Sequence, residues 1–214
     1  MSLIASVLHL DRRASKALRI TDPYSLHRVV YSLYEDVRTV EEKNASQTSG
    51  ILYADQGGDF HSRQILLLAD RMPAECIDGQ YGHVQSKPIT DSFLEHDRYR
   101  FKVILNPTRR DNASGKLLPV KGREAIGDWF CQRALQSWGF RVSPEHLQVG
   151  RVDVLCFKGK QQHPITVAQA HIQGQLKVTD RAQFHNSFVR GIGRARTFGC
   201  GLLQIVPLFD NPFA

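Results

Sequence analysis

Tyr24 and His27 are the residues of this sequence whose types and spacing best suit catalysis. They stand three positions apart in Asp22-Pro-Tyr-Ser-Leu-His-Arg28, so a helix starting there places both on one face, and Tyr31 continues that flank. An imidazole exchanges protons near neutral pH, and a helix N-terminus favours an anion such as a phosphate. Metal-free RNA cleavage needs a base for the ribose 2′-hydroxyl, an acid for the leaving 5′-oxygen and cationic support. His27, Tyr24 and Arg28 suit these three roles. The alternative interpretation is an aromatic flank of a helix with a surface histidine and no catalytic role.

A glycine-rich segment near the C-terminus is a second candidate. It contains Gly191, Gly193, Gly199 and Gly201, together with Arg194 and Arg196. Glycines allow tight turns and close approach to a ligand, and guanidinium groups suit phosphate oxygens. The segment lacks the Gly-Lys-Ser/Thr of a P-loop and the third glycine of a dinucleotide fingerprint, and it precedes a strand rather than a helix. It is therefore either a phosphate-facing loop of another kind or a glycine-rich turn that closes a sheet.

The stretch 98–123 is strongly basic, because Asp111 is its only acidic residue up to Arg123. Strand-like alternation sends Arg98, Arg100 and Lys102 to one face and apolar side chains to the other. Such a ladder suits a phosphate backbone, and the alternative is a solvated edge strand. Arg109, Arg110 and Lys116 flank a predicted mobile basic loop that would enter an RNA groove.

The first half of the chain predicts the elements that position the Tyr24–His27 pair. We expect strands at Leu3–Leu10, Ile51–Ala54, Gln64–Ala69 and Gln80–Gln85. A helix should start at the Asp22-Pro23 cap and run to about Val40, with an apolar stripe made by Leu26, Val29, Val30, Leu33 and Val37. With a short helix before the last strand, the order is β-α-β-β-α-β, which is ferredoxin-like.

The second half predicts the same order again. We expect strands at Arg98–Asn106, Leu147–Phe157, Thr166–Val178 and Gly201–Val206, and helices at Glu124–Trp138, ended by Gly139, and at Asp180–Arg190. The predicted fold is α+β, with two tandem ferredoxin-like domains and a cleft between them. Residues 1–90 would form the domain with the catalytic helix, and residues 96–214 the basic domain with the glycine-rich segment.

The charge of the chain is divided unevenly between these halves. Residues 1–95 hold 10 Lys and Arg against 13 Asp and Glu, whereas residues 96–214 hold 18 against 8, out of a net charge of +7. A basic half beside a mildly acidic one favours a polyanionic partner, with nucleic acid first.

Cysteine and histidine spacing gives no sign of a metal site. The four cysteines stand far apart without a Cys-x-x-Cys pair, and the nine histidines form no zinc-like cluster. We therefore expect no metal and no cofactor. The sequence has no cationic leader and no apolar run of membrane-spanning length, so a cytoplasmic protein is expected.

Several motifs, taken together, resemble a known family. They are Asp-Pro-Tyr24-x-x-His27-Arg, Arg98-x-Arg-Phe-x-x-x-x-Asn106-Pro107, Ala113-Ser-Gly-Lys116, Phe157-x-Gly159, Gly174-x-Leu176-x-Val178, and Gly191-Ile-Gly193 through Gly199-Cys-Gly-Leu-Leu to Pro207. In this order and spacing the chain resembles the CRISPR repeat-processing endoribonucleases of the CasE type, the RNA-cleaving subunits of the type I-E Cascade complex.

The resemblance implies two ferredoxin-like domains that bind the hairpin of a CRISPR repeat and cut at the 3′ base of its stem. It implies a metal-independent enzyme that leaves a 2′,3′-cyclic phosphate and a 5′-hydroxyl and stays on the mature crRNA, beside other subunits of a Cascade-type complex. His27 would carry the main catalytic role with Tyr24 assisting, and the general base stays open.

Two other functions remain open at this point. The chain would also suit a non-catalytic crRNA-binding assembly subunit of a CRISPR effector complex. A DNA-binding or protein-interaction module ranks last, because the sequence shows no helix-turn-helix.

Overall fold

The computed structural model describes residues 3–39, 41–42, 49–59 and 62–209, and it divides the chain into two compact units. Unit 1 comprises Met1–Thr90 together with Thr197–Gly199, and unit 2 comprises Asp91–Arg196 together with Cys200–Ala214. The short segment Thr197–Gly199 thus belongs to the first unit, although the sequence placed the whole glycine-rich segment in the second domain. Within the described residues, no helix combines the length and the apolar character needed to cross a membrane.

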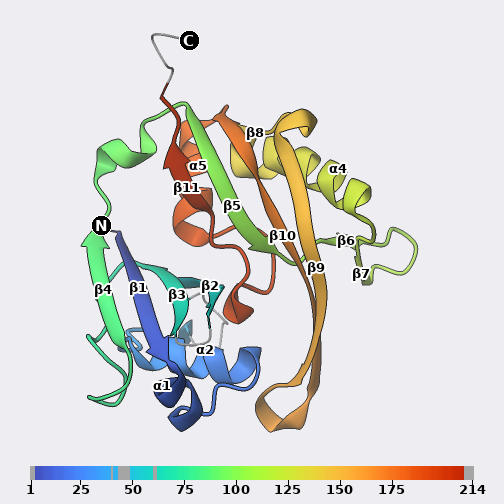
Figure 1. Cartoon of the computed structure of the whole chain (residues 1–214). Coiled ribbons are helices and arrows are strands. Elements are labelled where there is room, and N and C mark those ends of the chain that lie inside the picture. The colour runs from blue at the N-terminus through green and yellow to red at the C-terminus, as the bar shows by residue number, and fades with distance from the viewer. Residues whose placement is uncertain (1–2, 40, 43–48, 60–61, 210–214) are drawn as a thin grey trace. The chain divides into compact units, whose positions relative to one another are not determined.

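Unit 1 contains a four-stranded antiparallel sheet in the order β2-β3-β1-β4 (Figure 1). Its strands are β1 (Ile4–Asp11), β2 (Ile51–Gly58), β3 (Ser62–Ala69) and β4 (His83–Pro88), and its helices are α1 (Arg12–Ala17) and α2 (Pro23–Ser32). This strand order is that of a ferredoxin-like fold. The short helix expected before the last strand is not formed, because residues 70–82 run as irregular chain through Pro73, Gly79 and Gly82 and pair only at Ile77 and Tyr81.

Helix α2 begins as the sequence predicts and ends earlier. Asp22 is its N-cap and Pro23 its first residue, and Leu26, Val29 and Val30 are buried in the core of unit 1. The helix stops at Ser32 because the Leu33 carbonyl accepts a hydrogen bond from the Ala74 N–H at 2.8 Å instead of continuing the helical ladder. Val37, expected on the apolar stripe, is therefore 65% exposed, and Val40 lies outside the described residues.

Unit 2 contains the sheet order β11-β5-β10-β8, with β9 also paired to β10. The strands are β5 (Arg98–Leu105), β8 (Phe140–Arg141), β9 (Leu147–Lys158), β10 (Pro164–Val178) and β11 (Gln204–Pro207). With β8 and β9 as two pieces of the second strand, this order is again ferredoxin-like. The last strand begins at Gln204, not at Gly201, because the Gly201 N–H donates to the carbonyl of Ile104 and the chain before Gln204 is buried without strand pairing.

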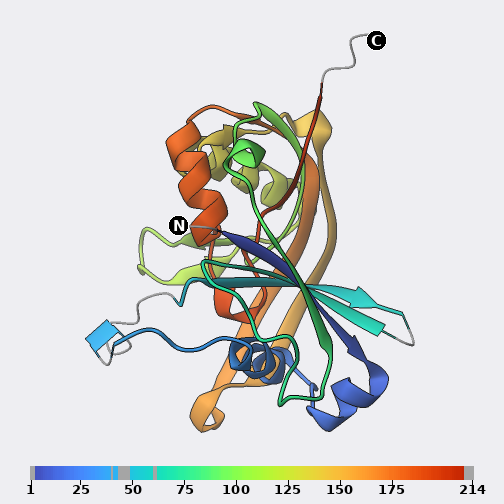
Figure 2. The ribbon, with the colours of Figure 1, turned by 90° about the vertical axis from the view of Figure 1, so that its left-hand side faces the viewer.

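Two helices cover one side of this sheet, as Figure 2 shows for the yellow-green α4 and the orange α5. Helix α4 (Arg123–Arg133) continues as a π-helical turn, η2 (Ala134–Trp138), up to Gly139, and α5 (Arg181–Arg190) is capped by Asp180. Short 3-10 turns complete the unit: η1 (Asp91–Leu94), η3 (Pro144–His146), η4 (Lys160–Gln162) and η5 (Arg196–Phe198), the last extending into unit 1. The most deeply buried rings of unit 2 are those of Tyr99, Phe101, Phe130, Phe140 and Phe184.

The stretch predicted to form a mobile basic loop is flanked by two short paired strands, β6 (Thr108–Arg110) and β7 (Leu117–Pro119). Its loop is closed by Asp111, whose carboxylate accepts hydrogen bonds from the hydroxyl and N–H of Ser114 at 2.6 and 2.8 Å. These two bonds hold the pKa of Asp111 below its usual value, and the bond from the Ser114 hydroxyl has the larger effect. Arg110 also donates to the Gly115 carbonyl at 2.7 Å, so one of the predicted RNA-binding arginines shapes the loop itself.

Candidate active site and nucleic-acid interface

His27 lies on α2 in an aromatic environment within unit 1. Its ring centre is 4.0 Å from that of Tyr31, one helical turn onward, and 6.2 Å from that of Tyr24, one turn back. A third ring, that of Phe198, meets it edge-on at 6.2 Å. The structure thus brings Tyr24 and His27 together as the sequence predicts, and it adds Phe198 from a segment far along the chain.

The segment Thr197–Gly199 is attached to unit 1 through Tyr53. The buried Tyr53 donates its hydroxyl to the Thr197 carbonyl at 2.8 Å. Gly199 has φ +79°, and a Cβ atom there would lie 3.1 Å from the Tyr53 ring, so glycine suits both the backbone conformation and the close approach. This arrangement places Phe198 beside His27.

The surroundings of His27 favour its neutral form. Burial of the half-buried ring lowers the pKa of His27 from 6.5, and a backbone interaction with Thr197 acts in the opposite direction. The Nδ1 atom is buried and has no hydrogen bond of normal geometry to any described residue. A neutral imidazole has one nitrogen that can accept a proton, so His27 at neutral pH can act as a proton acceptor. Its Nδ1 atom is still able to form a hydrogen bond.

The N-terminus of α2 is already occupied by its own cap, which corrects the expectation that it would hold a phosphate. The Asp22 carboxylate accepts from the Ser25 N–H at 2.7 Å, and the Ser25 hydroxyl oxygen accepts from the Asp22 N–H at 3.0 Å. Pro23 has no N–H to offer, and the Asp22 carboxylate already places a negative charge at the positive end of the helix dipole, which disfavours a second anion there. Cationic support near His27 must therefore come from a side chain, and the exposed Arg28 follows it directly on the helix.

Unit 2 contains a basic pocket of about 830 Å³, lined by the β6–β7 hairpin, α4 with η2, and the glycine-rich segment. The Trp129 indole N–H donates to the Thr108 carbonyl at 3.2 Å and joins α4 to the hairpin. None of the described residues that line this pocket is acidic. Its cationic side chains are those of Arg109, Arg110, Arg133 and Arg194.

The structure separates the remaining predicted binding residues into three places. Arg98, Arg100 and Lys102 are exposed on the outer face of β5, whereas Tyr99, Phe101 and Val103 are buried, as the alternation predicts. Lys116 is exposed in the loop of the β6–β7 hairpin. Arg28 lies in unit 1. The basic pocket therefore gathers only Arg109, Arg110 and Arg194 from the predicted set.

Arg196 has a structural role within the glycine-rich segment. Its side chain is half-buried and donates to the Arg190 carbonyl at the end of α5 at 2.6 Å.

All four glycines of this segment, Gly191, Gly193, Gly199 and Gly201, have positive φ. At Gly201 a Cβ atom would lie 2.4 Å from the Ile192 carbonyl oxygen, and the Ile192 N–H donates to the Gly201 carbonyl at 2.9 Å. The glycine-rich segment is thus partly a tight turn that closes unit 2, while Gly193 and Arg194 face the basic pocket.

Sequence reasoning missed Phe198, Trp129 and Arg133. Phe198 has no sequence signal, because its neighbour His27 is distant in the chain. Trp129 and Arg133 stand four residues apart on the predicted helix of the second domain, so the sequence could have predicted that they share one flank of it. The sequence could not predict that the β6–β7 hairpin lies against this flank.

Comparison with known proteins adds a family and a fold. Residues 3–207 match the family described as CRISPR associated protein. The chain is 27% identical over 207 residues to the CRISPR-associated endoribonuclease Cse3 of Thermus thermophilus, covering 91% of this chain and 95% of that protein. A solved structure of CRISPR endoribonuclease Cse3 bound to a 19-nucleotide RNA has a TM-score of 0.80 at 23% identity, over 97% of this chain and 100% of that one. A chain of a pre-nicking CRISPR RNA-guided surveillance complex has a TM-score of 0.65 at 23% identity, with the same two coverages. These structures confirm the α+β fold of two tandem ferredoxin-like domains.

Proposed function

Because this chain belongs to the CRISPR associated protein family, we propose that it is an endoribonuclease that binds the repeat hairpin of CRISPR precursor RNA and cuts at the 3′ base of the stem. The Thermus thermophilus relative, itself named an endoribonuclease, supports the activity, and the RNA-bound structure supports the ligand. The likeness to a chain of the surveillance complex supports a product that stays bound in a Cascade-type assembly with other subunits.

The observation that carries the proposal is the half-buried, aromatic-flanked His27. Its lowered pKa keeps the imidazole neutral at neutral pH and ready to accept the proton of the ribose 2′-hydroxyl. The 2′-oxygen then bonds to the adjacent phosphorus while the bond from phosphorus to the 5′-oxygen breaks, giving a 2′,3′-cyclic phosphate and a 5′-hydroxyl. Tyr24 supplies a hydroxyl proton to the leaving oxygen, and Arg28 balances the charge that develops on the phosphate. Side chains perform both proton transfers, so we assign no metal ion to the reaction.

Binding would depend mainly on unit 2, whose half of the chain holds the positive charge. The four arginines of the basic pocket come from a β-hairpin, a helix and a glycine-rich turn, and no acid opposes them among the described lining residues. Arginines in this number suit several phosphates of an RNA stem rather than one small anion. Unit 1 would then supply the catalytic helix, and unit 2 would supply most of the surface that binds the RNA hairpin.

The test is cleavage of a labelled repeat hairpin in EDTA by the wild type and by His27→Ala. The expected result is a single cut at the stem base by the wild type alone, with both proteins binding the hairpin about equally. His185→Ala, which removes an exposed histidine of α5, is the matched control and should cut normally.

Other outcomes point to other functions. Tight hairpin binding with no cut by the wild type would favour the non-catalytic assembly subunit. Equal cutting by wild type and His27→Ala would place the active site elsewhere, and cutting that EDTA abolishes would remove the metal-independent mechanism.

A further inference from the structure

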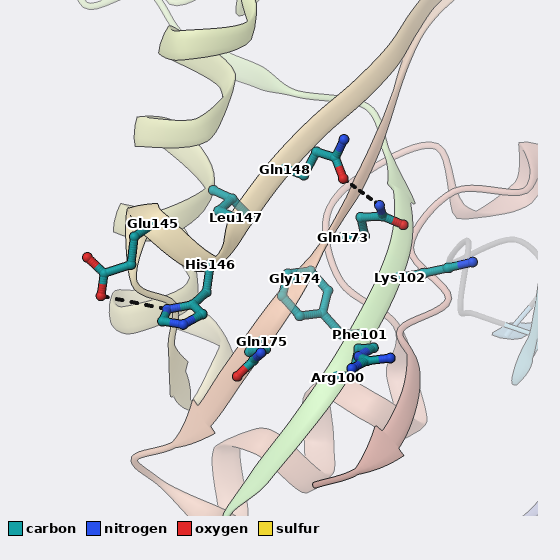
Figure 3. Close-up of a pocket in the computed structure, with 10 residues that line it drawn as sticks. All are labelled: Arg100, Phe101, Lys102, Glu145, His146, Leu147, Gln148, Gln173, Gly174 and Gln175. Carbon is teal, nitrogen blue, oxygen red and sulfur yellow. Dashed lines mark hydrogen bonds and ion pairs between the residues drawn. The ribbon is translucent and has the colours of Figure 1, made fainter.

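The outer face of the unit 2 sheet carries a second polar pocket, of about 480 Å³. It lies on β5, β9 and β10 (Figure 3), on the side away from the helices, because Tyr99 and Phe101 of β5 point into the helix-covered core while Arg100 and Lys102 are exposed. It shares no lining residue with the basic pocket at the β6–β7 hairpin. Unit 2 therefore has two separate surfaces with the chemistry to bind an anion.

Cations form a row along this face. Arg98, Arg100 and Lys102 alternate along β5, which spaces them by about 7 Å, close to the separation of consecutive phosphates in a nucleic-acid strand. The register places Lys177 of β10 directly opposite Arg98 and so widens the row. Glu145 is the one acid among the described lining residues, and its carboxylate lies 3.6 Å from His146 Nδ1 at the rim. The face is therefore complementary to a phosphate backbone.

Amide side chains form the other half of the face. Gln173 and Gln175 of β10 stand opposite Lys102 and Arg100, and Gln173 donates to the Gln148 side-chain oxygen at 2.6 Å, as drawn in Figure 3. Each amide offers both donors and an acceptor, which suits the edges of nucleobases. Those edges are accessible in unpaired RNA, whereas the deep, narrow major groove of an RNA stem hides them. The amides therefore favour single-stranded RNA over the hairpin stem.

His146 at the rim, beside Glu145, is the one exposed ring among the described lining residues, so this face offers little surface for stacking. The described residues that line the pocket include no exposed Phe, Tyr or Trp, since the Phe101 ring is only 1% exposed. Bases would be held by hydrogen bonds from the glutamines, with the strand backbone along the cations of β5. This chemistry differs from sheets that bind RNA by stacking bases on aromatic side chains.

We propose that this outer face, made by Arg100, Lys102, Gln148, Gln173 and Gln175, is a second RNA-binding surface that takes the single-stranded RNA adjoining the repeat hairpin. The proposal rests on the proposed function, because it assigns a second segment of the same RNA to the same protein. It separates two tasks within unit 2: the basic pocket holds the stem, and the outer face holds the unpaired flank.

The test compares two labelled RNAs, the repeat hairpin alone and the hairpin with an unpaired flank of about ten nucleotides. Dissociation constants and single-turnover cleavage rates are measured for the wild type, for Gln173→Ala/Gln175→Ala, and for Lys158→Gln as an exposed control on β9 outside the pocket. We expect the wild type to bind the flanked RNA about tenfold more tightly, as the hydrogen bonds of two amides would imply. The double variant should lose this advantage and bind and cut the bare hairpin normally, and the control should behave as wild type.

Each remaining outcome is decisive. Equal wild-type affinity for the two RNAs would overturn the inference, and so would a double variant that weakens the bare hairpin as much as the flanked RNA. A wild type that prefers the flanked RNA but cuts neither would overturn the nuclease proposal and leave the second surface supported. Cutting without any preference for the flank would do the reverse.

Discussion

Replacement of Tyr53 by phenylalanine tests whether the Thr197–Gly199 segment positions the catalytic histidine. The substitution keeps the buried ring that packs beneath Gly199 and removes only the hydroxyl that donates to the Thr197 carbonyl at 2.8 Å. A hydrogen bond of this kind contributes about 1 kcal/mol, and leaving the carbonyl without its donor raises the loss to about 1–2 kcal/mol. Since about 1.4 kcal/mol is a factor of ten, the docked segment becomes roughly tenfold less populated relative to its released form.

The assay measures single-turnover cleavage of the repeat hairpin at saturating protein, together with hairpin affinity and thermal unfolding. Release of the segment removes Phe198 and Thr197 from His27, so we expect cleavage to slow by up to about tenfold with little change in affinity. The melting temperature should fall by about 2–4 °C for each kcal/mol of destabilisation.

Tyr34→Phe is the matched control. Its hydroxyl is buried and has no hydrogen-bond partner among the described residues, so the same chemical change removes an unsatisfied polar group and should be neutral or stabilising. The ring keeps its contact with the Arg71 guanidinium, 5.6 Å from its centre. If the two variants cut at the same rate, or if Tyr53→Phe cuts as fast as wild type, Thr197–Gly199 does not position His27.

Four further predictions concern His27 and the arginines of the glycine-rich segment. If His27 is the base, the single-turnover rate of the wild type is level above pH 6.5 and falls as the pH drops through the lowered pKa of His27. A rate that instead falls with rising pH would make His27 the acid. Because the pKa of His27 is lower in the folded protein, the unfolded chain binds this proton at a higher pH than the folded chain does. The free energy of unfolding should therefore decline as the pH falls below 6.5, and this decline should be smaller in His27→Ala. Urea titrations at several pH values measure both. Arg194→Ala should weaken hairpin binding and reduce the slope of log affinity against log salt by about 0.7–0.9 for each phosphate that the side chain no longer neutralises. Arg196→Ala should mainly lower the melting temperature, because the Arg196 guanidinium donates a hydrogen bond to the Arg190 carbonyl. If both variants reduce the salt dependence equally, the assignment of RNA binding to Arg194 and of a structural role to Arg196 is wrong.

The sequence by itself determined the features that depend on neighbouring residues. Alternation along residues 98–103 predicted which of these side chains of β5 are exposed, because successive side chains of a strand point to opposite faces. The Asp22-Pro23 cap predicted the start of α2, and the three-residue spacing of Tyr24 and His27 predicted their common flank, because both follow from the local geometry of a helix. The predicted order of the strands was sufficient for the tandem ferredoxin-like fold, although the short helix predicted before the last strand of unit 1 is not formed.

Tertiary structure decided the features that depend on residues distant in the chain. Helix α2 ends at Ser32 because Ala74 takes the next carbonyl, and the helix N-terminus loses its place as an anion site to its own cap. The bond that brings Phe198 to His27 joins residues 144 positions apart, and no local preference of either residue specifies it. A hydrogen bond of that kind forms only after the sheet of unit 1 has placed Tyr53, so its energy depends on the folded chain and not on the sequence near the site.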